Sequence, residues 1–205
     1  MRIRNHWAPP FGQLGYYWFL TFEKIPELHS HVTECQASID FPYYDLVPLD
    51  RLHLTLDRIA PAQDLARDQI DSIETSIKRA CEHLPPFHIE INRLNGVGSA
   101  VAFNVQPAQS VHDLRDTLRS ATTAACPGIS LKPPKTSPPH ITIAYANSDD
   151  VSAADAMTAI DKVNATVRRV EIKVDEAVMV LLDREQRAYS WQVVSRVPLG
   201  GLAGR

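Results

Sequence analysis

The sequence contains little cysteine: three residues in 205, Cys35, Cys81 and Cys126. Their number is odd, they lie far apart, and no two form a Cys-x-x-Cys pair. A disulfide framework needs paired cysteines and a zinc knuckle needs clustered ones, so the sequence predicts neither. The cysteine content favours a reducing, cytoplasmic setting, and we expect no metal and no cofactor.

Long apolar runs and a large excess of one charge are also missing. No stretch approaches the roughly 18 apolar residues of a membrane span, and the start, with Arg2 and Arg4 before Asn5 and Pro9, lacks an apolar signal segment. We therefore expect no export segment and no membrane partner. The formal net charge of -3 disfavours a surface that coats long nucleic acid, and DNA is not an expected partner. A small nucleotide or an RNA end stays open as a ligand.

The hydrophobic pattern predicts alternating helices and strands. Residues 1–14 are expected to form an irregular arm, and residues 15–205 a single domain whose 44% hydrophobic content can fill one core. The expected elements are a strand at 16–22, a helix from Pro26 to Pro42, a strand at 52–57, a helix at 62–84, a hairpin over 87–105, a helix through 111–118, a strand from 140, a helix at 151–160, and strands near 168–181 and 188–197. Mixed helices and mostly antiparallel strands predict the α+β class, with an internal duplication in shape.

One short pattern occurs twice, as His53-Leu54-Thr55-Leu56 and as His140-Ile141-Thr142-Ile143. Side chains alternate across a β-strand, so each copy would point an imidazole and a hydroxyl to one face, about 7 Å apart, and bury the aliphatic pair. Two such strands facing each other would form a pocket with four polar groups.

The chemistry of those four groups suits a phosphodiester. Cleavage needs a base for the attacking oxygen and an acid for the leaving oxygen, and histidine, with an ordinary pKa near 6.5, serves either role. The threonine hydroxyls can donate to the charge that develops on the phosphate oxygens. The sequence holds no carboxylate cluster of the kind that binds a catalytic magnesium pair, so we expect metal-independent activity.

These residues resemble the two-histidine phosphoesterases, a family that includes bacterial 2'-5' RNA ligase-like proteins and RNA 2',3'-cyclic phosphodiesterases. The resemblance rests on Pro48–Leu56, on Pro139–Ala144 and on the apolar strand Tyr17–Phe22, and it spans roughly residues 15–197. It implies a bilobed α+β fold with pseudo-twofold, duplicated antiparallel sheets, flanking helices and a central cleft. It also implies metal-independent opening of 2',3'-cyclic phosphates on nucleotides or RNA termini, with reversible 2'-5' ligation in some members.

The resemblance also assigns residues. His53, Thr55, His140 and Thr142 match the catalytic tetrad of the family. The near symmetry of such a site leaves open which histidine is the acid and which the base, and we prefer His53 as the acid. We expect the protein to be a monomer.

Two positions differ from many relatives, which carry arginines in the opening strand and just after the second motif. Here those places hold Tyr16 or Tyr17 and Tyr145. Candidate substrate-binding residues are therefore aromatic groups that could stack on a base and cations that could meet a phosphate: Tyr17, Phe19, Tyr145, Lys135 and Arg58. Strict alternation buries Tyr145, and only a bulge or the end of the strand would bring it into the cleft. Arg58 has the wrong parity to share a face with Thr55 unless the strand has ended.

Other interpretations stay open at this point. The two motifs could belong to a binding module that holds a nucleotide or RNA end without turnover. The same chemistry could act on a non-RNA cyclic phosphate such as an ADP-ribose derivative. The arm, which contains His6, is either a lid or simple packing, and we assign no chemistry to His6 or His112.

Overall fold

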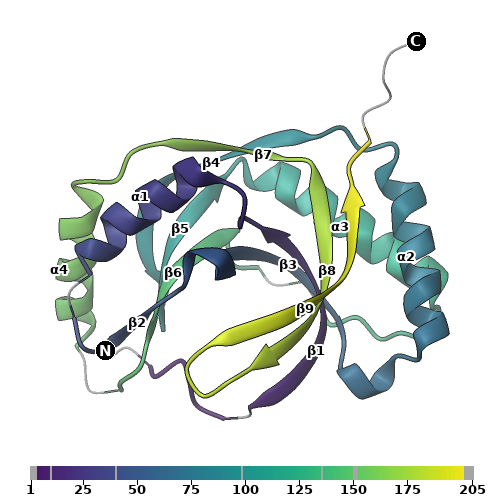
Figure 1. The fold of residues 1–205 in the computed structure, drawn as a ribbon, viewed down its shortest axis with the longest axis horizontal. Coiled ribbons are helices and arrows are strands. Elements are labelled where there is room, and N and C mark those ends of the chain that lie inside the picture. Colours follow the sequence, from purple (N-terminus) through teal and green to yellow (C-terminus); the bar gives the residue numbers. More distant parts are fainter. Residues whose placement is uncertain are drawn as a thin grey trace.

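Two antiparallel sheets make up the centre of the computed structural model, which describes residues 4–9, 11–39, 41–97, 99–134, 136–149 and 152–200 (Figure 1). The four-stranded sheet has the order β3 (His53–Ala60), β1 (Gly12–Thr21), β8 (Glu176–Arg184) and β9 (Tyr189–Pro198). The five-stranded sheet has the order β2 (Tyr44–Leu46), β6 (His140–Ala146), β5 (Ala100–Gln106), β4 (Phe87–Val97) and β7 (Val170–Val174). The two predicted motif strands, β3 and β6, therefore belong to different sheets.

Four helices flank the sheets: α1 (Pro26–Ala37), α2 (Arg67–Cys81), α3 (Ala108–Ala125) and α4 (Ala153–Asn164). Contacts place α1 and α4 on the five-stranded sheet, whereas α2 packs against α3 and β9, and α3 packs against β3 (Figure 1). The inward stripe of α2 consists of Ile70, Ile73, Ile77 and Cys81, whose spacing of three and four residues is that of one helix face. No helix in the described part of the chain is long and apolar enough to span a membrane.

The two sheets have matching strand orders around the motifs. Each motif strand pairs with one long antiparallel strand, β1 for β3 and β5 for β6, and that strand pairs in turn with β8 or β4. The extra strand β2 lies beside β6 alone. The predicted α+β class and its duplicated antiparallel sheets are thus confirmed.

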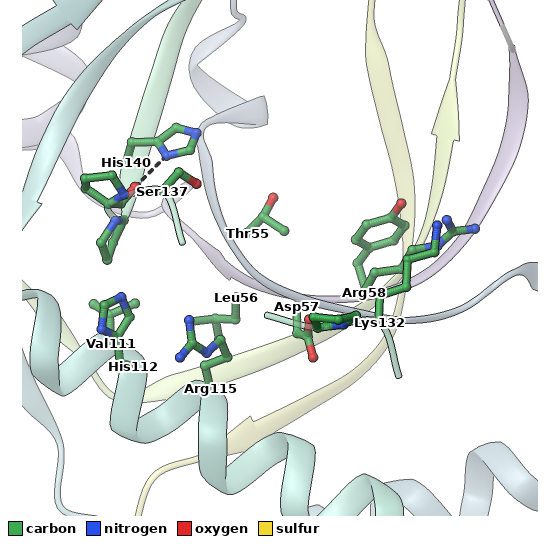
Figure 2. Close-up of a pocket in the computed structure, with 14 residues that line it drawn as sticks. Thr55, Leu56, Asp57, Arg58, Val111, His112, Arg115, Lys132, Ser137 and His140 are labelled. Carbon is green, nitrogen blue, oxygen red and sulfur yellow. Dashed lines mark hydrogen bonds between the residues drawn. The ribbon is translucent and has the colours of Figure 1, made fainter. Parts of the chain in front are cut away.

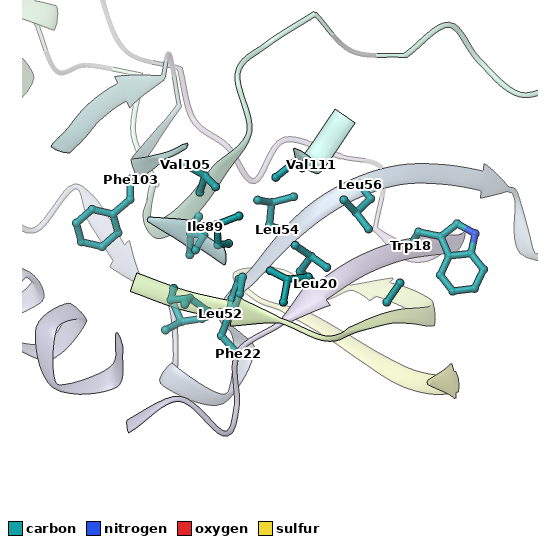
Figure 3. Packing of buried hydrophobic residues seen from close by; sticks show 14 of the residues in the cluster. Trp18, Leu20, Phe22, Leu52, Leu54, Leu56, Ile89, Phe103, Val105 and Val111 are labelled. Carbon is teal, nitrogen blue, oxygen red and sulfur yellow. The ribbon is translucent and has the colours of Figure 1, made fainter. Parts of the chain in front are cut away.

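The core lies between the sheets and is almost entirely aliphatic and aromatic. Figure 3 shows side chains from β1, β3, β4 and β5 meeting there, among them Trp18, Leu20, Leu54 and Phe103, all 2% exposed or less. Burial of this apolar surface is the main force that holds the two sheets together. Because Leu54 is one of these residues, its neighbours His53 and Thr55 must point to the opposite face of β3.

Two strand predictions were wrong in detail. The strand predicted near 168–181 is two strands, β7 and β8, which separate at Asp175 and enter different sheets. The opening strand starts at Gly12, not at Tyr16, because glycines extend it through conformations that other residues avoid. Gly15 has a φ of 123°, and a Cβ there would lie 2.1 Å from the carbonyl oxygen of Ala60.

Candidate active site

The two histidines stand at the first residues of β3 and β6, and both line one cavity of about 330 Å³. We call this cavity the catalytic cavity. Thr55 and Thr142, two residues further along each strand, line it as well. Pro138 and Pro139 precede His140, where proline's missing N–H costs the sheet no hydrogen bond. The four motif side chains, predicted to share a pocket, therefore converge from two sheets.

The same backbone contact orients both imidazoles. The Nδ1 atom of His53 lies 2.9 Å from the carbonyl oxygen of Arg51, and that of His140 lies 2.9 Å from the carbonyl oxygen of Pro138. A carbonyl oxygen only accepts, so Nδ1 carries the hydrogen in both rings. Nε2 is then the atom on each ring that can take up or release a proton in the cavity.

Aromatic rings surround His53. Phe19 of β1 stacks on its imidazole with centroids 4.4 Å apart, and Trp191 of β9 meets it edge-on at 5.3 Å. This burial lowers the pKa of His53 to about 4, and the nearby charge of His140 acts in the same direction, against the hydrogen bond to Arg51. His53 is therefore unprotonated at neutral pH.

A β-bulge follows the threonine in the second motif. Thr142 pairs with Ala102 and Ala144 pairs with Val101, so Ile143 has no partner on β5. The extra residue reverses the alternation, which brings Tyr145 onto the face of His140 and Thr142. There Tyr145 lines the catalytic cavity and is hydrogen-bonded to the Thr142 hydroxyl, and burial raises its pKa.

A bulge occurs at the equivalent position of the first motif. Thr55 pairs with Phe19 and Asp57 pairs with Trp18, so Leu56 has no partner on β1. Arg58 consequently faces the same side as Thr55 although β3 continues to Ala60. Its guanidinium donates to the carbonyl of Leu14 at 2.9 Å and lies 5.8 Å from the ring centroid of Tyr17.

Two further candidate residues, both on β1, reach the catalytic cavity. Tyr17 and Phe19 line the catalytic cavity, whereas Trp18 between them is 1% exposed and packs in the main core. Lys135 lies outside the described residues.

Sequence reasoning missed the contribution of the arm. His6 lines the catalytic cavity, where its Nε2 lies 2.9 Å from the Tyr189 hydroxyl and its Nδ1 lies 3.1 Å from the Ser99 hydroxyl. Its ring also stacks on Tyr145, with centroids 4.0 Å apart. No local pattern signals these contacts, because the partners are at least 93 positions away.

A second hollow opens beside the catalytic cavity, and we call it the side groove. It measures about 300 Å³ and lies between the end of β3, helix α3, the residues Lys132 and Pro133, and the residues Ser137–Pro139 (Figure 2). Tyr17, Thr55, Ser137 and His140 line both hollows, so the two are continuous. In the described part of the chain, no group of three or more His, Cys, Asp or Glu side chains is placed to hold a metal ion.

Several solved structures have the same fold. The TT0787 protein of Thermus thermophilus is 17% identical, with a TM-score of 0.68 over 92% of this chain and 100% of that one. LigT of E. coli, solved with 3'-AMP, is 16% identical, with a TM-score of 0.67 over 92% and 98% of the two chains. The MHV ns2 PDE domain is 9% identical, with a TM-score of 0.53 over 89% and 100%.

Comparisons of sequence find fewer matches than comparisons of structure. No curated protein is significantly similar to the chain. The model of the 2'-5' RNA ligase superfamily, however, matches residues 19–186, which include both motifs and most of the two sheets. The chain therefore belongs to the 2'-5' RNA ligase superfamily.

Proposed function

We propose that the protein is a metal-independent phosphodiesterase that opens 2',3'-cyclic phosphates on nucleotides or RNA ends by acid and base catalysis from His53 and His140. The observation that carries this proposal is the matched anchoring of two imidazoles in one cavity. Each is held through Nδ1 by the carbonyl two residues before it, which leaves Nε2 for proton transfer.

The proposed reaction uses each group once. One imidazole takes a proton from water as the water oxygen attacks phosphorus, and the other gives its proton to the ribose oxygen as the P–O bond breaks. The hydroxyls of Thr55 and Thr142 donate to the two non-bridging oxygens, which gain charge in the transition state. A 5'-hydroxyl that attacks in place of water, with the same base and acid, gives a 2'-5' bond. In the reverse reaction, which re-forms the cyclic phosphate, the roles of the two imidazoles exchange.

The burial of His53 favours one assignment of roles. Its pKa of about 4 makes it unprotonated at neutral pH, which suits the base, so His140 would be the acid for ring opening. This is the opposite of the preference that we drew from the sequence. A bound phosphate anion would raise the pKa of His53 and so help it to hold the proton that it receives.

The relatives support the substrate class. LigT has been solved with 3'-AMP, with phosphate, with ATP and with NADP+, all of which carry phosphate groups. A site with two imidazoles and two hydroxyls matches a tetrahedral phosphate in number and type of groups. The aromatic rings of Tyr17 and Phe19 on β1 would then offer a surface on which a base can stack.

The first experiment measures hydrolysis of adenosine and cytidine 2',3'-cyclic phosphates by the purified protein, with product isomers separated by chromatography. His53→Ala and His140→Ala should each lower kcat by about 10²-fold or more, because each removes one proton-transfer group. Thr55→Val and Thr142→Val should lower kcat by about 10²-fold, because each removes one donor to the developing charge.

His88→Ala is the matched control, since His88 is an exposed histidine on β4 opposite Lys173. Circular dichroism should show that every variant is folded. If the wild type is inert towards cyclic nucleotides, RNA ends, 2'-5' oligonucleotides and cyclic phosphates of ADP-ribose, the proposal fails. Binding of 3'-AMP without turnover would then favour a non-catalytic binding module.

A further inference from the structure

The side groove is lined by Arg and Lys side chains, whereas the described lining of the catalytic cavity contains neither. Its described lining carries three cations, Arg58, Arg115 and Lys132, and a single carboxylate, Asp57. The whole chain, in contrast, has a formal net charge of -3. Positive charge is therefore concentrated beside the motifs, next to Thr55 and His140.

The one carboxylate offsets these cations only in part, because its main partner is Arg119, with Arg115 a smaller influence. Arg119 of α3 donates to the carboxylate of Asp57, and its other terminal nitrogen donates to the carbonyl of Lys132 at 2.8 Å. Burial raises the pKa of Asp57, and the charge of Arg119 opposes that shift. Arg119 thus compensates the negative charge of Asp57 and holds the backbone of Lys132 beside the groove through a hydrogen bond.

The three cations keep donors available for a ligand. Arg58 donates to a neutral backbone carbonyl, which leaves its charge uncompensated there. Arg115 is 15% exposed and pairs through Nε with Asp116, whose carboxylate is 60% exposed and so contributes little. Figure 2 shows Arg115 and Lys132 apart from each other, with the Thr55 and His140 side chains above Arg115 in the view.

From these observations we propose that the side groove binds a second phosphate of the substrate, one that does not react, on the 5' side of the reacting nucleoside. This inference rests on the proposed function. A nucleoside 2',3'-cyclic phosphate has only one phosphate, and in the catalytic cavity it would leave the cations of the groove without a partner. Arg58 and Arg115 are partly buried, and low local polarity strengthens the charge-assisted hydrogen bonds of such cations to a phosphate, whereas Lys132 contributes its charge from an exposed position.

The test compares three substrates that share the reacting group. They are adenosine 2',3'-cyclic phosphate, its 5'-phosphorylated form, and a dinucleotide that ends in the same cyclic phosphate. We expect kcat/KM to be about tenfold or more higher when a second phosphate is present, the size of one charge-assisted hydrogen bond. Preference for the dinucleotide would identify a strand phosphodiester as the occupant, and preference for the 5'-phosphorylated form would identify a free nucleotide.

Substitutions in the groove then test whether its cations cause the preference for a second phosphate. Lys132→Ala and Arg115→Ala should each remove most of the preference, mainly through KM, and should lower kcat/KM for adenosine 2',3'-cyclic phosphate much less than kcat/KM for the substrates with a second phosphate. Lys173→Ala is the matched control, because Lys173 is an exposed lysine on β7 outside both hollows. Equal kcat/KM for all three substrates in the wild type, or a preference that survives both variants, would overturn the inference.

A binding measurement separates this inference from the proposed function. Adenosine 3',5'-bisphosphate and 3'-AMP differ only by a 5'-phosphate, and calorimetry measures their affinities without turnover. We expect the bisphosphate to bind about tenfold more tightly to the wild type and equally to Lys132→Ala. A wild type without turnover that still shows this difference would reject the reaction but keep the phosphate site, whereas equal affinities would reject the site.

Discussion

At the scale of single residues, the environment of His53 determines the pH at which its imidazole becomes protonated. Phe19 and Trp191 exclude water from its ring, and the carbonyl of Arg51 holds Nδ1. Removal of water disfavours the charged imidazolium more strongly than this one hydrogen bond favours it, so the pKa falls to about 4. The same side chain on an exposed strand would titrate near 6.5.

This shift predicts the pH dependence of the reaction. The kcat/KM profile reports the free enzyme, in which His53 must be unprotonated to act as the base. Because the pKa is lowered, the unprotonated form persists as the pH falls, and kcat/KM should decline only as the pH approaches about 4. An acid limb near the ordinary imidazole value would contradict the assignment of His53 as base.

Trp191→Ala provides the internal check on that profile. The substitution admits water to one edge of the His53 ring, so the acid limb should move to higher pH. Val193→Ala, which changes an exposed residue of the same strand, should leave the limb in place.

At the scale of elements, the two β-bulges decide which residues after the motif threonines line the catalytic cavity and the side groove. Strict alternation places Arg58 and Tyr145 away from their motif threonines, and this was the basis for doubting them from the sequence. One unpaired residue after each threonine, Leu56 and Ile143, reverses the alternation. It turns Tyr145 towards the catalytic cavity and Arg58 towards the side groove. A bulge has no reliable signature in a single sequence, because it depends on the register with a partner strand.

The N-terminal arm is the second element whose position came only from the structure. The N–H of His6 donates to the carbonyl of Ala146 at the end of β6, and Arg184 of β8 donates to the carbonyl of His6. The indole of Trp7 donates to Asp45 of β2 at 2.8 Å. The arm therefore links the five-stranded sheet to the β8–β9 hairpin beside the catalytic cavity.

We expect His6 to hold Tyr145 and Tyr189 in place. His6→Ala should lower the free energy of unfolding by about 1–2 kcal/mol through lost hydrogen bonds. It should also lower kcat/KM, because Tyr145 contacts Thr142. His6→Phe keeps the stacking on Tyr145 but not the bond to Tyr189, so partial recovery would separate the two contacts. Urea unfolding and kinetics measure both effects, and activity equal to wild type in His6→Ala would exclude this role.

At the scale of the whole molecule, the candidate active site forms because the end of the chain returns to the sheet that its start began. β1 and β3 come from the start of the chain, whereas β8 and β9 come from its end, and together they form the sheet that carries His53. The other sheet carries His140, and all of its strands except β2 come from the part of the chain between β3 and β8. Each histidine is placed by strands from distant parts of the sequence, so the motifs approach each other only after both sheets have packed.

The proposed reaction predicts that removal of metal ions leaves the rate of hydrolysis unchanged. Proton transfer by two imidazoles and donation by two hydroxyls supply the whole proposed reaction without a Lewis acid. Hydrolysis of cyclic nucleotides should therefore be unchanged after dialysis against EDTA and after addition of Mg²⁺ or Zn²⁺. A loss of activity in EDTA that a metal ion restores would contradict this reaction scheme.

The sequence by itself determined most of the helices and strands and predicted the residues of the candidate site. Helical spacing of apolar residues such as Ile70, Ile73 and Ile77 and the alternation around each motif are local patterns that the backbone geometry imposes. The paired His-x-Thr patterns likewise favoured phosphodiester chemistry, because imidazole and hydroxyl are the side-chain groups that can exchange or donate the protons such a reaction needs.

Only the tertiary structure decided how those groups are surrounded. The burial of His53, the bulges that turn Arg58 and Tyr145, the docking of His6 and the cations of the side groove depend on contacts between residues far apart in the chain. Such contacts form where two sheets pack and strands choose their register, and neither event has a local cause that a sequence pattern can reveal.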